Sequence, residues 1–584
     1  MAKIKMSLLL FVTEEVFMKF KISGQWSDGY KHDGMLFFAQ KTEEMLFYYT
    51  NHIYKVPVYN SYLLMWEYLY TSQLVKEKAI NEGHLKYILE EFIETFENDI
   101  VINDNISEDR MKYIIQTLNS SSLLDIERII HYLFCYLDNY DKMCVDYLKK
   151  IIAEPKQKKK IERAIRCYLP TLLNGGYSQE FVYKYNNKFW NNVNISSTKV
   201  LDEYFCRFDF KPRKYKVYIC LNKKVRQFKK IFENRLKANF EQDKFSTKLK
   251  YDKNKYLQVS FDVEELDEYK AAQRAYNIVN LFLRFYRFLG NRRDEWYLEK
   301  CLVVDENEEY FITDVIPSGY SYSEDYDDKT IGRSSEALIT DLINNANNSF
   351  GVINKLLEIH NTAINESDMQ NSFLNLWSII EIIGVNKHDD SKMIEIEEAV
   401  IPVLFNDYIV NIFEELHDYI KANIKEKSYQ EIVLNIDSKV SEYEKIAYIV
   451  ILKQYDESRK KLIAEFEDYP LIRSRISQLH NIFNVKNGYF NVIEKYERRV
   501  RWHLRRMYRT RNAIIHSGED IDNLKSLGEH LHSYVDELLY EITTQLAIKH
   551  SYRTIDNVLI NERFKMDETK KFLKEKKKSH VRIF

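Results

Sequence analysis

Apolar residues with helical spacing fill most of the C-terminal half of this chain of 584 residues. One stripe consists of Phe373, Leu376, Trp377, Ile380 and Ile383, and a second consists of Leu524, Leu527, Leu531, Tyr534, Val535, Leu538 and Ile542. Steps of three and four residues place such side chains on one face of a helix. Because only 14 glycines and 7 prolines interrupt the whole chain, long helices can continue. The sequence therefore predicts a mainly α, multidomain protein.

Changes in this pattern divide the chain into four parts. Residues 1–205 are predicted to be a mostly helical region, with possible short strands at its start in the runs MLFFAQ and MLFYYT. Residues 206–330 contain KYKVYICL and KYLQVSFDV, whose strand-length apolar patterns predict an α+β middle domain. The polar stretch 316–335 is the best candidate for a linker. Residues 331–560 then predict an all-α helical bundle, and 561–584 a basic tail.

Charge, cysteine spacing and short motifs argue against several classes of function. The formal net charge is −2, so any binding of RNA must come from local patches. No cysteine belongs to a C-x-x-C pair, and no His, Cys, Asp and Glu cluster has metal-ligand spacing, so we expect no metal and no cofactor. No phosphate-binding glycine loop occurs either. Since no apolar run reaches about 18 residues, we expect no membrane association and a cytoplasmic location.

The segment RNAIIH, residues 511–516, is the strongest candidate for a catalytic motif. In a straight helix Arg511 and His516 would point roughly 140° apart, with a rise of about 7.5 Å between them. Gly518 predicts that the helix ends just after His516, where the ring could turn toward a groove that the arginine also reaches. There the guanidinium could hold a phosphate and the imidazole could transfer protons near neutral pH. Asn512 would add an amide beside them.

The spacing of arginine and histidine is weak evidence by itself. It also occurs at Arg475–His480 and at Arg498–His503, where no asparagine follows the arginine. For RNAIIH taken alone, a surface arginine and a capping histidine remain the competing interpretation.

The arginine-rich run before RNAIIH has two interpretations. Arg505, Arg506 and Arg509 lie on the same predicted helix as RNAIIH. Their guanidinium groups could bind the phosphates of RNA. Alternatively, their long stems could cover a core while their charges pair with acidic neighbours. The phosphate interpretation is favoured because RNAIIH follows.

RNAIIH, inside a C-terminal helical bundle, resembles the R-[polar]-x-x-x-H signature of HEPN ribonucleases. FLNLWSIIEIIG at 373–384 resembles the opening helix of the Apea-like HEPN subgroup, which commonly reads aromatic-x-x-L-W-x-x-x-E. Trp377 and Glu381 occupy the matching places. The two segments lie in the order that the family has, and together they cover roughly residues 335–550, well under half of the chain.

The resemblance implies a HEPN-like bundle that forms a homodimer or higher homo-oligomer. Two R-x-x-x-x-H motifs would meet in one metal-independent endoribonuclease site, leaving 2′,3′-cyclic phosphate and 5′-hydroxyl ends. It implies that Arg511 steadies the phosphate and that His516 is the general acid and base. Asn512 would orient the groups, and Glu381 would be an orienting or core polar partner.

Family members often act in bacterial anti-phage defence, as abortive-infection or toxin effectors. The resemblance therefore implies an RNA substrate, and it makes a phage-derived or partner-protein trigger possible. Residues 1–330 would be a sensing or regulatory region. A second interpretation is a non-catalytic HEPN-like protein, an antitoxin or scaffold, that binds RNA or a partner. The intact Arg511, Asn512 and His516 favour the enzyme, because a purely structural bundle does not need all three.

Overall fold

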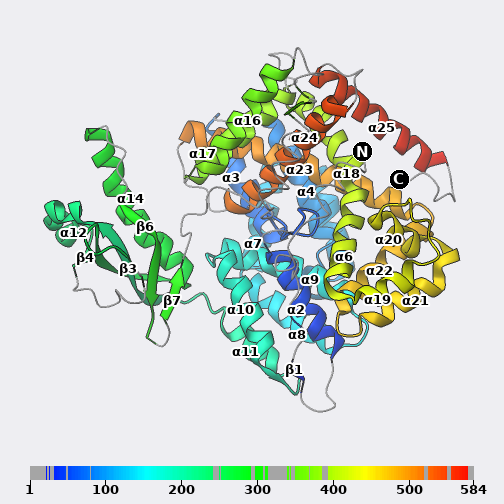
Figure 1. Cartoon of the computed structure of the whole chain (residues 1–584), viewed down its shortest axis with the longest axis horizontal. Coiled ribbons are helices and arrows are strands. Elements are labelled where there is room, and N and C mark those ends of the chain that lie inside the picture. The colour runs from blue at the N-terminus through cyan, green and yellow to red at the C-terminus, as the bar shows by residue number, and fades with distance from the viewer. Residues whose placement is uncertain are drawn as a thin grey trace.

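The computed structural model describes residues 22, 25–26, 32–47, 50–78, 80–240, 249, 251–290, 296–306, 309–312, 339–340, 342, 349–366, 368–384, 392–517, 524–548 and 554–575. The chain is mainly helical, with a small antiparallel sheet in its middle region (Figure 1), as the sequence predicts. Within the described residues, no helix has the length and apolar character needed to span a membrane. The expected linker at 316–335 lies outside the described residues.

Residues 33–46 are helical where the sequence predicts a possible short strand. MLFFAQ lies within helix α2 (Asp33–Leu46), in which every residue from Met35 to Leu46 is buried. A helix that is buried on all sides has no apolar stripe, so a short apolar run does not distinguish it from a strand. One short strand does occur before α2, because β1 (Gln25–Trp26) pairs in parallel with β2 (Asn194–Ile195).

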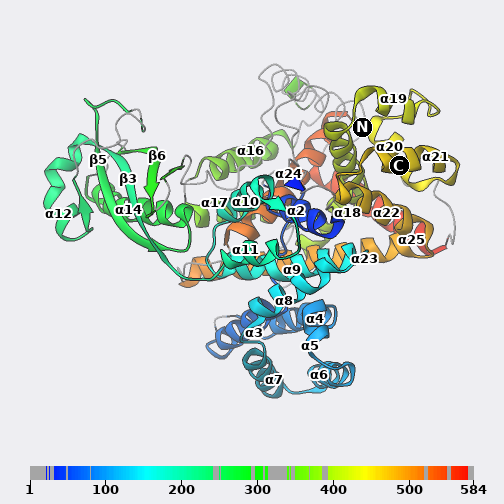
Figure 2. The same ribbon diagram turned by 90° about the horizontal axis from the view of Figure 1, so that it is seen from below.

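The rest of the N-terminal region is helical, as predicted. It consists of α3 (Ser61–Lys76), α4 (Gly83–Glu97), α5 (Ile100–Asn105), α6 (Glu108–Ser120), α7 (Leu123–Tyr136), α8 (Tyr140–Ala153), α9 (Lys158–Asn174), α10 (Gln179–Asn192) and α11 (Val200–Cys206). Figure 2 shows α3 to α7 grouped on one side of the long C-terminal helix α23 (Gly488–Ser517). Contacts between α4 and α23 join this group to the C-terminal part.

The middle region has the predicted α+β structure. Its five-stranded sheet has the order β4-β5-β3-β6-β7 and is antiparallel at every pairing. The strands are β3 (Arg213–Asn222), β4 (Ala238–Asn239), β5 (Tyr256–Glu265), β6 (Tyr297–Val304) and β7 (Glu309–Ile312). Helix α14 (Glu268–Gly290) packs on the sheet, and together they bury a separate hydrophobic core. The sheet lies to one side of the helical body (Figure 1).

The C-terminal region is a large helical assembly. Its helices are α16 (Phe350–Asn365), α17 (Met369–Gly384), α18 (Lys392–Asn423), α19 (Glu426–Val433), α20 (Glu442–Ile451), α21 (Asp456–Glu465), α22 (Pro470–Asn484), α23, α24 (Leu524–Ile548) and α25 (Ile555–Glu575). Both apolar stripes found in the sequence are buried, on α17 and α24. The predicted basic tail is helical as far as residue 575, because α25 packs against α18 and buries Glu562.

The N-terminal and C-terminal helices share one hydrophobic core, although they are far apart in the sequence. Residues 50–60 form much of the connection. Lys55 makes a buried ion pair with Glu529 of α24, with 3.2 Å between Nζ and Oε2. His52 hydrogen-bonds the hydroxyl of Tyr496 on α23 at 2.9 Å. The described helices of residues 1–205 and of residues 331–560 therefore pack as one body, whose core is distinct from that of the sheet region.

Candidate functional site

Helix α23 brings the RNAIIH segment to the surface at its C-terminal end. The helix ends at Ser517, so His516 lies in its last turn, where the sequence expectation from Gly518 puts it. The side chain of His516 lies outside the described part of the structure. Arg511 and Asn512 lie one turn earlier, and both are partly exposed.

Glu381 of α17 lies against this end of α23. Its Oε2 is 3.7 Å from Nη2 of Arg511, and Arg511 Nη1 donates a hydrogen bond to Asn512 Oδ1 at 3.1 Å. The other carboxylate oxygen, Oε1, accepts a hydrogen bond from Trp377 Nε1 at 2.8 Å and pairs with Lys392 Nζ at 2.9 Å. Arg511, Asn512 and Glu381, which the sequence singled out together, are thus adjacent in space.

The local sequence explains why Glu381 has this fixed position. Trp377 and Glu381 are separated by four residues, which places them on neighbouring turns of one helix face. Trp377 is fully buried, with its ring centroid 6.2 Å from that of Tyr508 on α23. The tryptophan therefore anchors α17 against α23, while its indole N–H fixes the carboxylate that reaches Arg511.

Two cations meet one carboxylate among the described residues at this helix end. One carboxylate, Glu381, is shared between two cations, Arg511 and Lys392. Side-chain exposure is 26% for Arg511 and 36% for Lys392, so both cations can reach a ligand from solvent. A phosphate group has the charge and the acceptor oxygens that suit such a pair. Lys392 was missed in the sequence, because nothing in its local pattern connects it with RNAIIH.

The three arginines expected to contact RNA have another role. Arg505, Arg506 and Arg509 are 8%, 2% and 9% exposed. Arg505 pairs with Glu397 of α18 and lies over the ring of Tyr87. These side chains are turned inward, so the RNA-contact prediction is corrected in favour of the alternative, a core-covering and charge-pairing role.

Arg506 and Arg509 form a buried charge cluster with the N-terminal helices. Arg506 Nη2 is 2.7 Å from both Glu67 Oε2 of α3 and Glu91 Oε2 of α4. Arg509 Nη2 is 2.7 Å from Glu67 Oε1. Burial alone would raise the pKa of Glu67, but the two guanidinium groups outweigh it and lower that pKa to about 2. Glu67 is therefore ionised at neutral pH and clamps α23 to α3.

The other two Arg–His pairs with the same spacing have structural partners. His480 Nδ1 lies 2.8 Å from the carbonyl oxygen of Val450, and Arg475 pairs with the buried Glu44. His503 is buried and hydrogen-bonds the hydroxyl of Tyr534 at 3.0 Å. The Arg498 of that pair contacts Glu94 at 3.2 Å.

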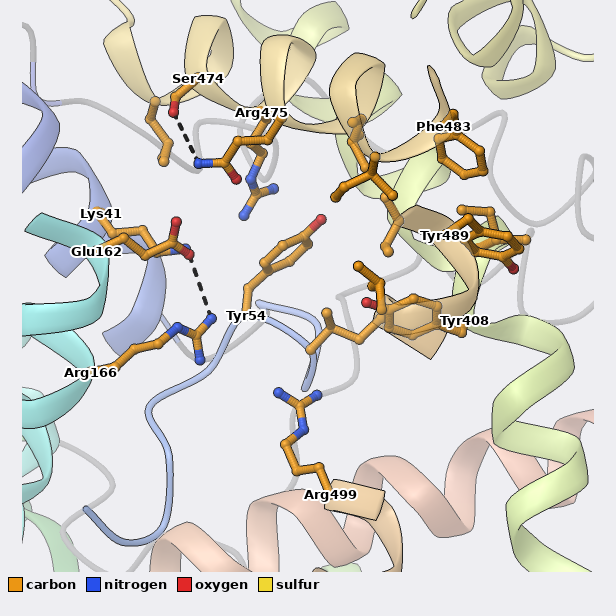
Figure 3. Close-up of a pocket in the computed structure, with 18 of the residues that line it drawn as sticks. Lys41, Tyr54, Glu162, Arg166, Tyr408, Ser474, Arg475, Phe483, Tyr489 and Arg499 are labelled. Atoms are coloured by element: carbon orange, nitrogen blue, oxygen red, sulfur yellow. Dashed lines mark hydrogen bonds and ion pairs between the residues drawn. The ribbon is translucent and has the colours of Figure 1, made fainter. Parts of the chain in front are cut away.

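A cavity of about 220 Å³ lies between the N-terminal and C-terminal helices (Figure 3). Its charged lining residues are Lys41, Glu162, Arg166, Arg475 and Arg499. Glu162 pairs with Lys41 at 3.0 Å and with Arg166 at 3.7 Å, so part of this charge is neutralised within the wall. Arg511, Asn512 and Glu381 are not among the lining residues, so the cavity is separate from the described part of the site at the end of α23.

One group of metal-type ligands is present among the described residues. It consists of His360 on α16 and of His532 and Asp536 on α24. The sequence analysis, which found no cluster with metal-ligand spacing, did not anticipate this group. His532 and Asp536 have the spacing of one helical turn, but His360 is 172 residues away from His532, and no local pattern predicts that pairing.

The strongest candidate site is the end of α23, where Arg511, Asn512, Glu381 and Lys392 converge and His516 lies in the last helical turn. A partly exposed cationic pair beside a carboxylate and an amide can bind and orient a phosphodiester. Comparisons of the chain with protein-family models, with curated proteins and with solved structures give no match.

Proposed function

We propose that this chain is a HEPN-type endoribonuclease, in which Arg511, Asn512 and His516 of two copies form one metal-independent site. The observation that supports it most is the contact between Glu381 and Arg511, because the two segments that resemble the family come from separate helices. The two partly exposed cations at this point, Arg511 and Lys392, suit an RNA phosphate.

The proposed reaction is an in-line transesterification. One His516 removes the proton of the 2′-hydroxyl, whose oxygen attacks the adjacent phosphorus. The P–O5′ bond breaks on the opposite side, and the leaving oxygen takes a proton from the His516 of the second copy. The products are a 2′,3′-cyclic phosphate and a 5′-hydroxyl end. Arg511 and Lys392 stabilise the negative charge that develops on the phosphoryl oxygens.

Exposed apolar side chains support self-association near this site. Ile382, Ile394 and Ile515 are 44%, 54% and 49% exposed. Ile382 follows Glu381 directly, Ile394 lies two residues after Lys392, and Ile515 lies one helical turn after Arg511. Apolar residues at a rim of charged groups suit an interface between two copies with a two-fold axis. Such an axis would bring both His516 side chains to one phosphate.

The biological role that fits this chemistry is anti-phage defence, in which RNA cleavage follows activation by a phage-derived or protein trigger. The N-terminal helices touch the site helix directly through Glu67 and Glu91. If binding of a trigger changed the packing of α3 and α4, these ion pairs would transmit the change directly to α23. A HEPN-like protein that binds RNA or a partner without cutting is the alternative, and the cleavage assay distinguishes the two.

The test is incubation of the purified protein with total RNA in the presence of EDTA. We expect cleavage to continue, with 2′,3′-cyclic phosphate and 5′-hydroxyl ends, because side chains supply all proton transfers. Cleavage that EDTA abolishes and Mg²⁺ or Mn²⁺ restores would contradict the proposed chemistry. Absence of cleavage with retained RNA binding would favour the non-catalytic alternative.

Replacement of Lys392 by alanine should weaken RNA binding without unfolding the protein. The logarithm of the RNA-binding constant falls linearly with the logarithm of the salt concentration. If Lys392 contacts one phosphate of single-stranded RNA, its loss should make this slope less steep by about 0.7. Fluorescence anisotropy at several salt concentrations measures this slope. Lys460, which is exposed and pairs with Glu457, provides the control. An unchanged slope for Lys392→Ala, equal to that for Lys460→Ala, would remove Lys392 from the site.

A further inference from the structure

Three ligand atoms of the group His360, His532 and Asp536 converge on one point. The two histidine Nε2 atoms are 3.2 Å apart. Asp536 Oδ1 lies 2.8 Å from Nε2 of His360 and 3.3 Å from Nε2 of His532. Each side chain thus directs one donor atom at the space between the other two.

The size of this triangle matches the coordination shell of a transition metal. Zinc binds histidine nitrogen and carboxylate oxygen at about 2.0–2.2 Å, in a tetrahedral arrangement. Tetrahedral geometry then separates neighbouring ligand atoms by about 3.3 Å. The separations of 3.2 and 3.3 Å lie close to this value. The 2.8 Å hydrogen bond between His360 and Asp536 would lengthen when an ion replaced its proton. Two nitrogens and one oxygen favour zinc and related ions over magnesium and calcium, which prefer oxygen ligands.

The helices hold the ligands in place. His532 and Asp536 are one turn apart on α24. His360 comes from a separate helix, α16. Both α16 and α24 pack against α17, the helix that contains Trp377 and Glu381. An ion shared by these helices would therefore fix the two neighbours of α17.

The exposure of the group also suits an ion. Side-chain exposure is 6% for His532 and 51% for Asp536, so the group opens to solvent on one side. Water could complete the coordination there.

We propose that His360, His532 and Asp536 bind one zinc-class divalent ion per chain and that this ion braces α16 and α24 around α17. In the described contacts, these three residues do not touch Arg511, Asn512 or Glu381. The ion therefore has a stabilising role and takes no part in the proposed phosphate chemistry. This inference holds whether or not the chain cleaves RNA.

The test is metal binding by the full-length protein. After removal of metal with a chelator, equilibrium dialysis against Zn²⁺ should return one bound ion per chain. Substitution with Co²⁺ should give the visible absorption of a four-coordinate site, and Zn²⁺ should raise the melting temperature of the wild-type protein. His532→Ala should lose all three signals, and Asp536→Asn, which preserves side-chain shape, should lose or strongly weaken them.

His417→Ala is the matched control, because His417 Nδ1 lies 3.2 Å from Asp418 Oδ1. The described metal-type group does not include this histidine–aspartate pair. Its replacement should leave the stoichiometry at one. No bound Zn²⁺ in the wild-type protein, or one ion retained by both His532→Ala and Asp536→Asn, would overturn the inference. None of the three readouts uses RNA, so failure of the metal-site proposal is distinguishable from failure of the proposed nuclease function.

Discussion

Replacement of His516 by alanine is expected to reduce RNA cleavage by about 10²- to 10⁴-fold, the range typical for loss of a general acid or base. In the proposed dimer the change removes both imidazoles from the composite site, so the larger end of that range is expected. Binding of RNA should fall much less, because Arg511 and Lys392 remain. Single-turnover cleavage and anisotropy measure the two effects separately.

His480→Ala and His503→Ala are the controls for His516→Ala. Both histidines have an arginine five residues earlier, but His480 contacts the Val450 carbonyl and His503 the Tyr534 hydroxyl. Correctly folded forms of these variants should keep most of the activity, with circular dichroism and melting temperature as checks of folding. Loss of cleavage in a folded His480→Ala protein, while His516→Ala remains active, would move the site away from the end of α23.

Replacement of Glu67 by alanine is expected to have the largest effect on stability. Glu67 is 6% exposed and pairs with both Arg506 and Arg509. Its loss leaves Glu91 as the partner of Arg506 and removes the described ion pair of Arg509. Removal of one partner from a buried ion pair typically lowers the free energy of unfolding by about 3–5 kcal/mol. Chemical denaturation of both proteins measures the difference.

The control is Glu108→Ala, because Glu108 forms an exposed pair with Lys112, and exposed pairs contribute about 0–1 kcal/mol. An effect of Glu67→Ala no larger than that of Glu108→Ala would contradict the clamping role. The pH dependence gives a second check. Since the folded pKa of Glu67 is lowered from 4.5 to about 2, its stabilising effect is complete above pH 4.5 and disappears as the pH falls toward 2. Burial raises the pKa of Glu91, which opposes this trend.

Local patterns in the sequence predict the elements well where one face of a helix or strand is apolar. The stripes of α17 and α24, and the strands β3 and β5, follow from such periodicity. The prediction for helix α2 was wrong because the helix is buried on every side, so its apolar residues show no helical periodicity. The helical structure also extends beyond the predicted end of the bundle at residue 560, because α25 continues to Glu575 in the expected tail.

Long-range pairing explains what the sequence could not predict at the site. Arg511 and Glu381 were named through two separate motifs, but neither motif predicted the contact between them that the structure shows. The burial of Arg506 depends on Glu67, more than 400 residues earlier, and an arginine-rich helix has the same local pattern whether its charges face acids or solvent. Lys392 belongs to the site only because α18 begins beside the end of α17. None of these partners has a local signal.

The composite site is tested most directly by mixing two inactive subunits. One subunit has Arg511→Ala, the other has His516→Ala, and the two are co-expressed with different affinity tags so that the mixed dimer can be purified. The shared site would then contain one intact Arg511 and one intact His516. If each chain had its own independent site, the mixed dimer would cleave at the mean rate of its two parent homodimers. Cleavage clearly above that mean is the result expected. A rate no higher than the mean, in a mixed dimer that is folded and binds RNA, would contradict a site built from two chains.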